Sequence, residues 1–320
     1  MALLEKITLL PDQFARWFAG RGWMPRPHQL ELLAKAQAGR SVLLIAPTGG
    51  GKTLAGFLPS LVELSGLNAP STAARRAEGG KRLISIGRDI RRAGGLHTLY
   101  ISPLKALAVD IARNLEAPVA EMGLPIRIET RTGDTPTSKR QRQRRDPPDI
   151  LLTTPEQLAL LLASADAPYL FGSLKRVILD ELHALVTSKR GDLLSLDLAR
   201  LFRVAPGLTS IGLSATVAEP DDLCRFMVPQ RDGAARADLI LAEGGAAPDV
   251  SMLDSDERLP WAGHSARYAL GELYALIKAH RTTLVFVNTR SQAEGIFQDL
   301  WHLNEDNLPI ALHHGSLDVA

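Results

Sequence analysis

Short apolar runs recur between residues 42 and 242, and amphipathic stretches separate them. The clearest runs lie at 42–45, 96–101, 125–130, 150–153, 174–180, 208–214 and 238–242. Each is short and bounded by turn-forming residues, as expected for a buried strand. The stretches between them, such as 54–64 and 105–121, carry apolar residues at helical spacing. Because strands that alternate with helices favour a parallel sheet covered on both faces, the pattern predicts an α/β fold.

Two amphipathic segments precede the first strand, at residues 9–22 and 27–39. In the first, Phe14, Trp17 and Phe18 recur at i, i+3 and i+4, the spacing of one helix face. The second begins with prolines and ends at a glycine, which are typical helix boundaries. We expect both segments to be helices that pack on the core.

The regular alternation of apolar runs and amphipathic stretches is interrupted at two places. Residues 65–95 interrupt the regular pattern and predict a surface excursion with a small hairpin around residues 83–86. Residues 246–265 are rich in Gly, Pro, Asp and Ala, which is typical of a linker. We therefore predict a first domain over residues 1–245, a linker over 246–265 and a partial second α/β unit over 266–320. That unit should contain helices at 266–280 and 291–303 and strands at 284–290 and 309–316.

Composition narrows the class of protein. The 320 residues suggest about two domains. The 37 basic and 35 acidic residues leave a formal charge of +2, which argues neither for nor against nucleic acid. The single cysteine, Cys224, excludes an internal disulfide and a cysteine-built metal site in this chain. No apolar run approaches the length of a membrane span, and the start lacks a signal-peptide pattern. We expect a cytoplasmic protein with no membrane partner.

The residues that follow the first strand, APTGGGKT at 46–53, have the form of a phosphate-binding loop. Three glycines after Thr48 would let backbone N–H groups point at phosphate oxygens. Lys52 should reach the β- and γ-phosphates, and Thr53 should place its hydroxyl on Mg²⁺. A glycine-rich turn with a chance Gly-Lys pair is the alternative, but the strand before and the helix after favour nucleotide binding. The loop alone does not separate a kinase, a GTPase and a motor. Its nucleotide-contacting residues are Thr48, Gly49, Gly50, Gly51, Lys52 and Thr53.

Gln29 lies one strand upstream of this loop. A side-chain amide offers both a donor and an acceptor, which matches the N6/N7 edge of adenine. The alternative is a solvated helix glutamine.

Asp180 and Glu181 end the apolar run at 174–180. An aspartate at this tip is placed to hold Mg²⁺, and the next carboxylate can orient and deprotonate the attacking water. The alternative is a pair of acids at a helix N-terminus. His183 could sense the γ-phosphate or couple to the segment Ser214–Ala215–Thr216, whose hydroxyls suit a relay between nucleotide and bound strand. A plain turn is the alternative for that segment.

Three further strand tips, SPLKA, TRTGDTP and TTPE, share hydroxyls, glycine and a cation, Lys105 or Arg131. Such groups suit phosphate oxygens. Aromatic residues are scarce there, so we expect backbone tracking with weak sequence specificity. The basic run at 139–145 could extend this surface, or it could be a solvated face.

Taken in order, PRPHQ, APTGGGKT, SPLKALA, TRTGDTP, TTPE, DELH, SAT, FVNTR and HHGS resemble the motifs of superfamily 2 helicases. SPLKALA, TRTGDTP, DELHAL and HHGSL resemble the large-helicase-related (Lhr) group. The segment FARWFAGRGWMPRPHQLELLAKA resembles the bacterial ligase-associated DEXH-box branch of that group.

The resemblance implies two RecA-like domains, with ATP and Mg²⁺ in the cleft and a single strand bound across both. It implies 3′ to 5′ translocation with duplex unwinding. It assigns adenine recognition to Gln29, phosphate binding to Lys52, Mg²⁺ to Thr53 and Asp180, and water activation to Glu181. It assigns coupling to Ser214 and Thr216. The implied nucleic-acid contacts are Ser102, Lys105, Thr132, Gly133, Thr154 and Pro155 in the first domain, and Thr289, Arg290 and Gly315 in the second.

The printed sequence stops after HHGSL, before the second-domain arginines of the family. Because such an arginine is typically worth about 10³–10⁵ in rate, we expect these residues to bind ATP–Mg²⁺, to hydrolyse it poorly and not to unwind. Two candidate functions are compatible with these motifs. One is the motor part of a nucleoid-associated helicase acting on single-stranded DNA or RNA–DNA hybrids, with a repair role and a functional link to a DNA ligase. The other is an ATP-responsive nucleic-acid clamp. The strand-tip motifs argue against a kinase or GTPase.

Overall fold

The computed structural model describes residues 9–67, 95–215, 217, 219–230, 234–242, 249–253 and 266–317. The hairpin predicted around residues 83–86 and most of the predicted linker lie outside these residues. The chain divides into two compact units, Met1–Ala246 and Ala247–Ala320. Each unit is described by itself.

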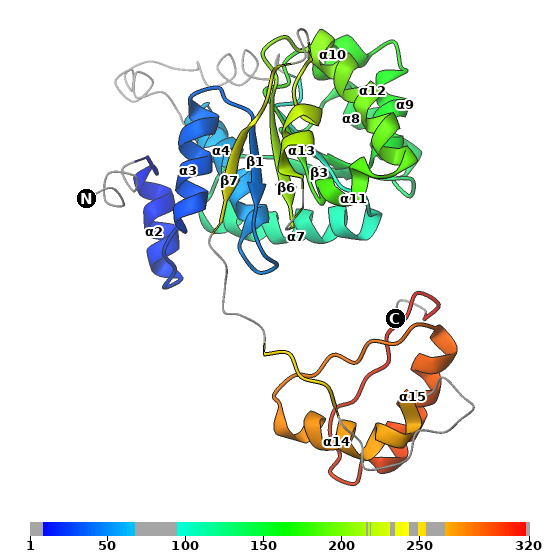
Figure 1. Cartoon of the computed structure of the whole chain (residues 1–320). Helices are drawn as coiled ribbons and strands as arrows, with labels where there is room; N and C mark the ends of the chain where they lie inside the picture. The colour runs from blue at the N-terminus through cyan, green and yellow to red at the C-terminus, as the bar shows by residue number, and fades with distance from the viewer. Residues whose placement is uncertain are drawn as a thin grey trace, which may run out of the picture. The chain divides into compact units, whose positions relative to one another are not determined.

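The first unit is built on one parallel sheet, as the alternating pattern predicted (Figure 1). Within the described residues, seven strands pair in the order β3-β4-β2-β5-β6-β1-β7. They are β1 (Val42–Ile45), β2 (Thr98–Ile101), β3 (Ile128–Arg131), β4 (Ile150–Thr153), β5 (Arg176–Leu179), β6 (Thr209–Ser214) and β7 (Asp238–Leu241). The central strands are apolar on both faces because helices cover both faces of the sheet.

Helices fill the connections between the strands. In the first unit they are α2 (Asp12–Gly20), α3 (Pro27–Gln37), α4 (Lys52–Leu67), α7 (Lys105–Glu121), α8 (Thr137–Arg145), α9 (Pro155–Leu162), α10 (Ala167–Phe171), α11 (Leu182–Val186), α12 (Lys189–Val204) and α13 (Pro220–Phe226). Proline at the first position of α3 costs no hydrogen bond, because the first N–H groups of a helix have no partner within it.

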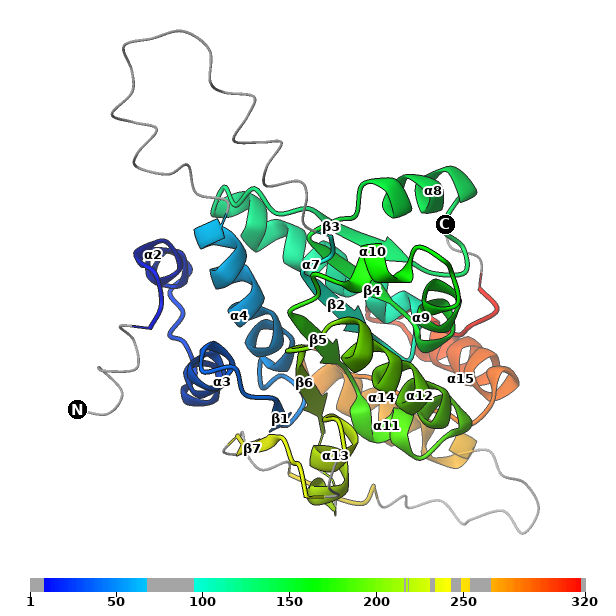
Figure 2. The same ribbon diagram turned by 90° about the horizontal axis from the view of Figure 1, so that it is seen from above.

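Successive strand residues point to opposite faces, so each strand contributes to two cores. Leu44 and Tyr100 belong to the core under α2, α3, α4 and α7. Leu43 and Leu99 belong to the core under α9, α10, α11, α12 and α13. Figure 2 shows the sheet between these two groups of helices. The result is a three-layer α/β/α unit.

Because every strand pair is parallel, all the loops that follow the strands lie along one edge of the sheet. The strand order divides that edge into two halves. The loops after β1, β6 and β5 are neighbours, and so are the loops after β2, β4 and β3. Ligands of open α/β sheets bind at this edge.

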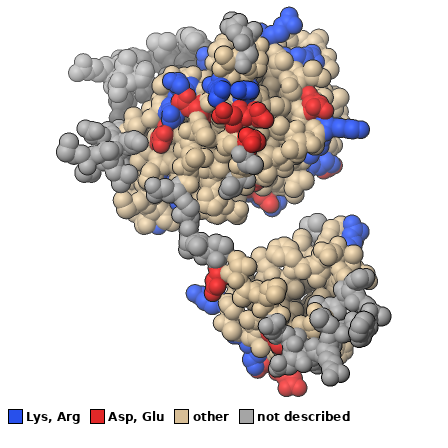
Figure 3. Space-filling model, viewed as in Figure 1, with Lys and Arg blue, Asp and Glu red and all other residues tan. Residues whose placement is uncertain are grey.

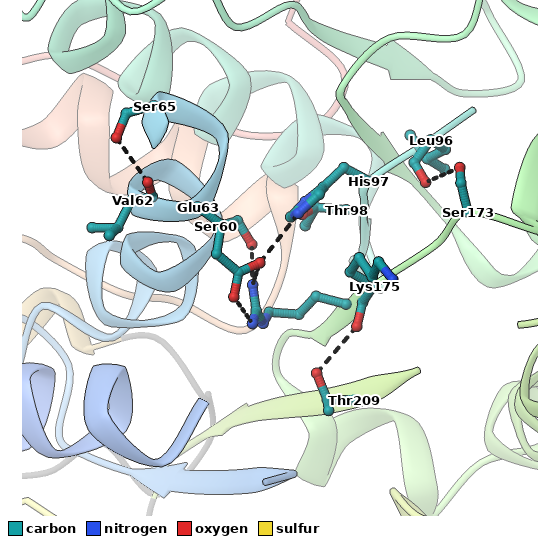
Figure 4. A network of polar contacts seen from close by, with 11 residues as sticks. Ser60, Val62, Glu63, Ser65, Leu96, His97, Thr98, Ser173, Lys175 and Thr209 are labelled. Atoms are coloured by element: carbon teal, nitrogen blue, oxygen red, sulfur yellow. Dashed lines mark hydrogen bonds and ion pairs between the residues drawn. The ribbon is translucent and has the colours of Figure 1, made fainter. Parts of the chain in front are cut away.

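At the opposite edge, an ion-pair network fixes the far end of α4 (Figure 4). The buried Arg176, at the start of β5, places its two terminal nitrogens 3.1 and 2.8 Å from the carboxylate of Glu63 on α4. His97 Nε2 lies 3.2 Å from the same carboxylate. Burial raises the pKa of Glu63, but hydrogen bonds from His97 and Arg176 outweigh it and lower that pKa to about 2. The helix that begins at Lys52 is therefore anchored near its C-terminal end.

The second unit contains the short 3₁₀ helix η1 (Ala266–Ala269), followed by α14 (Leu270–Ala279) and α15 (Arg290–Leu303). The two strands predicted at 284–290 and 309–316 are not formed, since no strand occurs in residues 266–317. That prediction was wrong. Leu284 and Phe286 are 76% and 88% exposed, so these segments lack the flanking strands that make a pair of strands stable.

Among the described residues, no helix combines the length and the apolar character needed to cross a membrane.

Candidate functional site

The loop between β1 and α4 is shaped by its glycines. Gly49 and Gly51 have φ angles of +76° and +73°, a region that side-chain-bearing residues rarely adopt. A Cβ atom on Gly51 would also stand 2.8 Å from the Gln29 amide nitrogen. Position 51 therefore requires glycine for its backbone conformation and for the close approach of α3.

Lys52 is the first residue of α4, and its ammonium turns back over the loop. Its Nζ atom lies 2.8 Å from the Ala46 carbonyl oxygen and 3.3 Å from the Pro47 carbonyl oxygen. The only cation of the loop is thus held against the backbone turn, where a phosphate would meet it. The sequence-based role of Lys52 in binding the β- and γ-phosphates stays a prediction.

Two residues of α3 tie that helix to the loop. Gln29 is 4% exposed; its Oε1 accepts from the Arg26 N–H at 2.9 Å, and its Nε2 donates to the Gly51 carbonyl at 3.3 Å. His28 Nε2 lies 2.9 Å from the Gly50 carbonyl oxygen. Burial lowers the pKa of His28, which favours a neutral ring that donates to this carbonyl. The solvated-glutamine alternative is wrong, although one amide hydrogen and one lone pair of Gln29 remain unused.

Asp180 follows β5 and is 4% exposed. Its Oδ1 accepts from the Glu181 N–H at 2.9 Å, and the Tyr100 hydroxyl donates to its Oδ2. Burial raises the pKa of Asp180, while the hydrogen bonds and the charge of Lys52 lower it. Only β6 separates β5 from β1 in the sheet, so Asp180 and the phosphate loop lie close together along this edge.

Glu181 has a φ angle of 47°, in the left-handed region. Such a conformation is uncommon for a residue with a long side chain, and strained residues of this kind gather at functional sites. The turn allows Asp180 and Glu181, although adjacent in sequence, to direct their carboxylates differently.

A histidine joins the β5 tip to the β6 tip. His183 Nε2 lies 3.5 Å from the Glu181 carboxylate, and its Nδ1 lies 3.0 Å from the Ser214 hydroxyl oxygen. The Ala215 N–H points at the same Nδ1 from 3.4 Å. Because that N–H can only donate, Nδ1 acts as the acceptor, and the Nε2 hydrogen faces Glu181. The third predicted coupling residue, Thr216, lies outside the described residues.

The tips of β2 and β3 converge on the other half of the edge. Lys105, the first residue of α7, places its Nζ 3.1 Å from the Asp134 carboxylate and against Gly133. The Thr132 hydroxyl accepts from the Asp134 N–H at 3.3 Å. Exposed positions at this surface are Lys105, Gly133 and Asp134.

The other predicted strand-contact residues of this unit are less accessible. Ser102 and Thr154 are buried, and the Ser102 hydroxyl accepts from the Leu104 N–H at 3.3 Å. Pro155, also buried, begins α9. Arg131 points its guanidinium at the Arg140 carbonyl of α8, 3.4 Å away, and burial lowers its pKa. The structure therefore places Arg131 beneath α8 rather than at the surface proposed for phosphates.

The basic run at 139–145 lies in α8, and most of its arginines have partners. Arg140 donates to the carbonyls of Thr132 and Gly133. Arg142 and Arg144 form ion pairs with acidic residues, Glu129 and Asp166. Among the Lys and Arg residues of the run in the part of the chain that the structure describes, the side chains of Lys139 and Arg145 form no hydrogen bond or ion pair, in contrast to those of Arg140, Arg142 and Arg144. On the face shown in Figure 3, charges of both signs lie next to one another.

Three predicted contact residues belong to the second unit. Thr289 precedes α15, and its hydroxyl accepts from the Gln292 N–H at 3.2 Å, which caps that helix. Arg290 donates to the Ser316 hydroxyl and lies beside Gly315. The structure thus brings Arg290 and Gly315 together within this unit.

Known proteins share this arrangement. A family profile described as DEAD/DEAH box helicase matches residues 26–223, from the start of α3 into α13. The chain belongs to the DEAD/DEAH box helicase family. The RecA-like nucleotide-binding fold predicted for the first domain is confirmed by this match and by the parallel sheet.

Relatives within the helicase family carry the Lhr name, in agreement with the resemblance read from the motifs. The ATP-dependent helicase Lhr-Core protein 2 of Thermococcus barophilus is 35% identical over 98% of this chain and 36% of its own length. The Lhr helicase/probable uracil glycosylase of Mycolicibacterium smegmatis is 36% identical over 93% of this chain and 19% of its own length. The chain therefore spans about a third or less of the relatives it matches.

A solved structure of a helicase is also similar. The Mycobacterium smegmatis helicase Lhr bound to ssDNA and AMP-PNP superposes with a TM-score of 0.72 at 33% identity. The match covers 96% of this chain and 38% of that one. It extends the similarity to both units of the chain.

Three residues of the candidate site were not found from the sequence. His28 contacts the phosphate loop, and Tyr100 contacts Asp180. Arg190 bonds to Glu156 and, at 2.7 Å, to the Pro103 carbonyl oxygen. Tyr100 could have been found, because it lies in an apolar run predicted to be buried and a buried tyrosine hydroxyl usually needs a hydrogen-bond partner. The roles of His28 and Arg190 depend on contacts between segments distant in sequence, which no local pattern reveals.

Proposed function

We propose that this chain carries the ATP-binding part of an ATP-dependent nucleic-acid helicase of the Lhr type. The observation that carries the proposal is the meeting of the phosphate loop, the Asp180–Glu181 tip and the His183–Ser214 contact at one edge of a parallel sheet. The Lhr structure bound to ssDNA and AMP-PNP supports it.

The roles follow from the geometry around the loop. Lys52 binds the β- and γ-phosphates of ATP, with backbone N–H groups of the glycine-rich turn as further donors. Glu181 orients and deprotonates the water that attacks the γ-phosphate. The Gln29 amide, held by Arg26 and Gly51, presents its unused hydrogen and lone pair to the adenine edge.

The residues at this edge also fit Mg²⁺. The buried Asp180 carboxylate and the Thr53 hydroxyl are hard oxygen donors of the kind this ion prefers, directly or through water. Mg²⁺ held by these residues would neutralise the charge that develops on the phosphate oxygens during phosphoryl transfer. Asp180 is prepared for this role because two hydrogen bonds fix its carboxylate before any ligand arrives.

The surface formed by Lys105, Gly133 and Asp134 is proposed to follow a single strand. Lys105 would exchange its exposed ion pair with Asp134 for a phosphate, at little cost because exposed pairs contribute little stability. Backbone contacts of this kind carry no sequence information, so the specificity should be weak. We infer movement 3′ to 5′ on single-stranded DNA and a repair role from the sequence resemblance.

The test is a set of binding and turnover measurements on residues 1–320. AMP-PNP binding with Mg²⁺ should be measured by calorimetry, and ATP hydrolysis should be measured with and without an oligo-dT strand. Lys52→Ala should weaken AMP-PNP binding by about 10- to 100-fold, because the variant has no ammonium to form a charge-assisted hydrogen bond with a phosphate. Unchanged binding would contradict the phosphate-loop assignment.

Hydrolysis separates the two candidate functions. Turnover stimulated by oligo-dT supports a motor. If AMP-PNP binds and changes the affinity for oligo-dT while no turnover occurs, the chain by itself acts as an ATP-responsive clamp. Absence of both AMP-PNP binding and oligo-dT binding would contradict the motor and the clamp alike.

A further inference from the structure

The side chain of Tyr100 connects three parts of the nucleotide site. It lies in the middle of the sheet, on β2, and is fully buried. Its hydroxyl donates to Asp180 Oδ2, and its ring stacks on Phe57 of α4 with centroids 5.2 Å apart and planes 28° apart. Tyr100 donates one of the two hydrogen bonds that fix the Asp180 carboxylate.

Strand alternation explains how Tyr100 reaches Asp180. Tyr100 is the partner of Ile178 in the β2–β5 ladder, and Asp180 lies two residues beyond Ile178. Residues two apart on a strand point to the same face, so Tyr100, Ile178 and Asp180 all face the α4 side of the sheet. A tyrosine side chain is long enough to span this diagonal, and a shorter one is not.

The stack on Phe57 connects the same side chain to the other proposed Mg²⁺ ligand. Phe57 lies four residues after Thr53 in α4, and residues at this spacing share one face of a helix. Tyr100 therefore contacts the helix that carries Thr53 through its ring and the strand that carries Asp180 through its hydroxyl. Both ligand-bearing elements meet one rigid side chain.

The hydroxyl is a permanent donor. A tyrosine hydroxyl is ordinarily protonated at neutral pH, and here it is buried against a carboxylate oxygen that can only accept. The phenol therefore keeps its proton. A phenylalanine would fill the core equally well, so the hydroxyl has to be explained by what it contacts.

We propose that Tyr100 is a positioning residue that fixes the carboxylate of Asp180, relative to Thr53, in the orientation that binds Mg²⁺ together with the nucleotide phosphates. This inference rests on the proposed function of the site. Partners that orient a ligating carboxylate typically change metal affinity by about 10- to 100-fold when they are removed.

The test compares Tyr100→Phe with the wild-type chain by calorimetric titration of AMP-PNP, once with MgCl₂ and once with EDTA. The dissociation constant in EDTA divided by the dissociation constant in MgCl₂ measures how much Mg²⁺ strengthens AMP-PNP binding. Tyr100→Phe should lower this ratio about tenfold and leave the affinity in EDTA unchanged. Tyr169→Phe is the matched control, because its hydroxyl is exposed and donates to the Arg145 carbonyl, away from Asp180; it should keep the wild-type ratio.

A double-variant cycle shows whether Tyr100 acts through Asp180. In the Asp180→Asn background, Tyr100→Phe should produce no further fall in the ratio. A wild-type ratio in Tyr100→Phe, or an equal fall in both backgrounds, would overturn the positioning role. A general folding defect would lower the affinity in EDTA as well, which also counts against it. If the wild-type chain binds no AMP-PNP, the proposed function itself fails, which is a different outcome.

Discussion

His183 Nδ1 lies 3.0 Å from the hydroxyl oxygen of Ser214, and this contact joins the tip of β5 to the tip of β6. The same imidazole faces the Glu181 carboxylate through Nε2, at 3.5 Å. A change at the γ-phosphate side of Glu181 can therefore be transmitted to β6 through one ring. The contact is a physical route, and the coupling itself has to be measured.

Ser214→Ala removes the hydroxyl without changing the strand. We expect AMP-PNP–Mg²⁺ affinity to change by less than about tenfold, because the substitution keeps the Ser214 carbonyl that accepts from the Ala46 N–H of the phosphate loop. The effect of AMP-PNP on oligo-dT affinity should disappear, which fluorescence anisotropy can measure. Ser210→Ala is the control, since Ser210 is a buried serine of the same strand whose Oγ has no partner within the described part of the chain. Equal effects of both variants would contradict a specific role for the contact.

Glu181→Gln should separate binding from turnover. The amide keeps the size of the side chain but cannot accept a proton, so any ATP hydrolysis should fall by about 10²–10⁴. AMP-PNP affinity should stay close to that of the wild-type chain. Phosphate release and calorimetry measure the two quantities, with the exposed Glu116→Gln on α7 as the matched control. Retained hydrolysis in Glu181→Gln would exclude it as the base.

The two unpaired cations of α8, Lys139 and Arg145, are the ones available to a phosphate backbone. Replacing both by Gln should weaken oligo-dT binding and reduce its salt slope by up to about 0.7 for each phosphate that is no longer neutralised. Replacing the paired Arg142 and Arg144 by Gln should leave that slope nearly unchanged, because these guanidinium groups already neutralise Glu129 and Asp166. Equal slopes for both double variants would favour a solvated face.

Asp197, on α12, gives a prediction about stability. It is 3% exposed, its Oδ2 has no hydrogen-bond partner among the described residues, and burial raises its pKa from 3.8 to about 6. A raised folded-state pKa means that the protonated form is favoured on folding. This contribution is complete below pH 3.8 and is lost as the pH rises through 6.

Asp197→Asn should therefore gain stability relative to the wild-type chain between pH 4 and pH 7, by about 2–3 kcal/mol. Urea unfolding at several pH values measures this difference. The exposed Asp192→Asn on the same helix should show no such trend. A constant difference between wild-type and Asp197→Asn across this range would show that the buried carboxyl does not titrate as described.

The sheet and the order of its tips could be predicted because both depend on local patterns. Apolar runs such as 42–45 can be stable only when both faces are covered, and a parallel sheet places every following loop at one edge. The phosphate loop was equally clear, since its glycines and Lys52 are consecutive. The same reasoning failed at 284–290, where an apolar run without neighbouring strands does not form a ladder.

Side-chain partners were less accessible to sequence reasoning. Gln29 was open to two interpretations until its burial against Gly51 excluded the solvated one. Arg131 was expected at a phosphate surface, but it lies under α8, a helix formed by the basic run itself. Both outcomes depend on segments that fold back over the strand tips.

The sequence by itself determined the sheet, the phosphate loop and the residues that end each strand, because strand burial, glycine conformation and the spacing of a loop are local properties. Only the tertiary structure decided which of those residues meet. The Tyr100–Asp180 and His183–Ser214 contacts each join strands that are adjacent in the sheet but 80 and 31 residues apart in the chain. Their pairing is set by strand order and register, and these are fixed by the packing of the whole sheet.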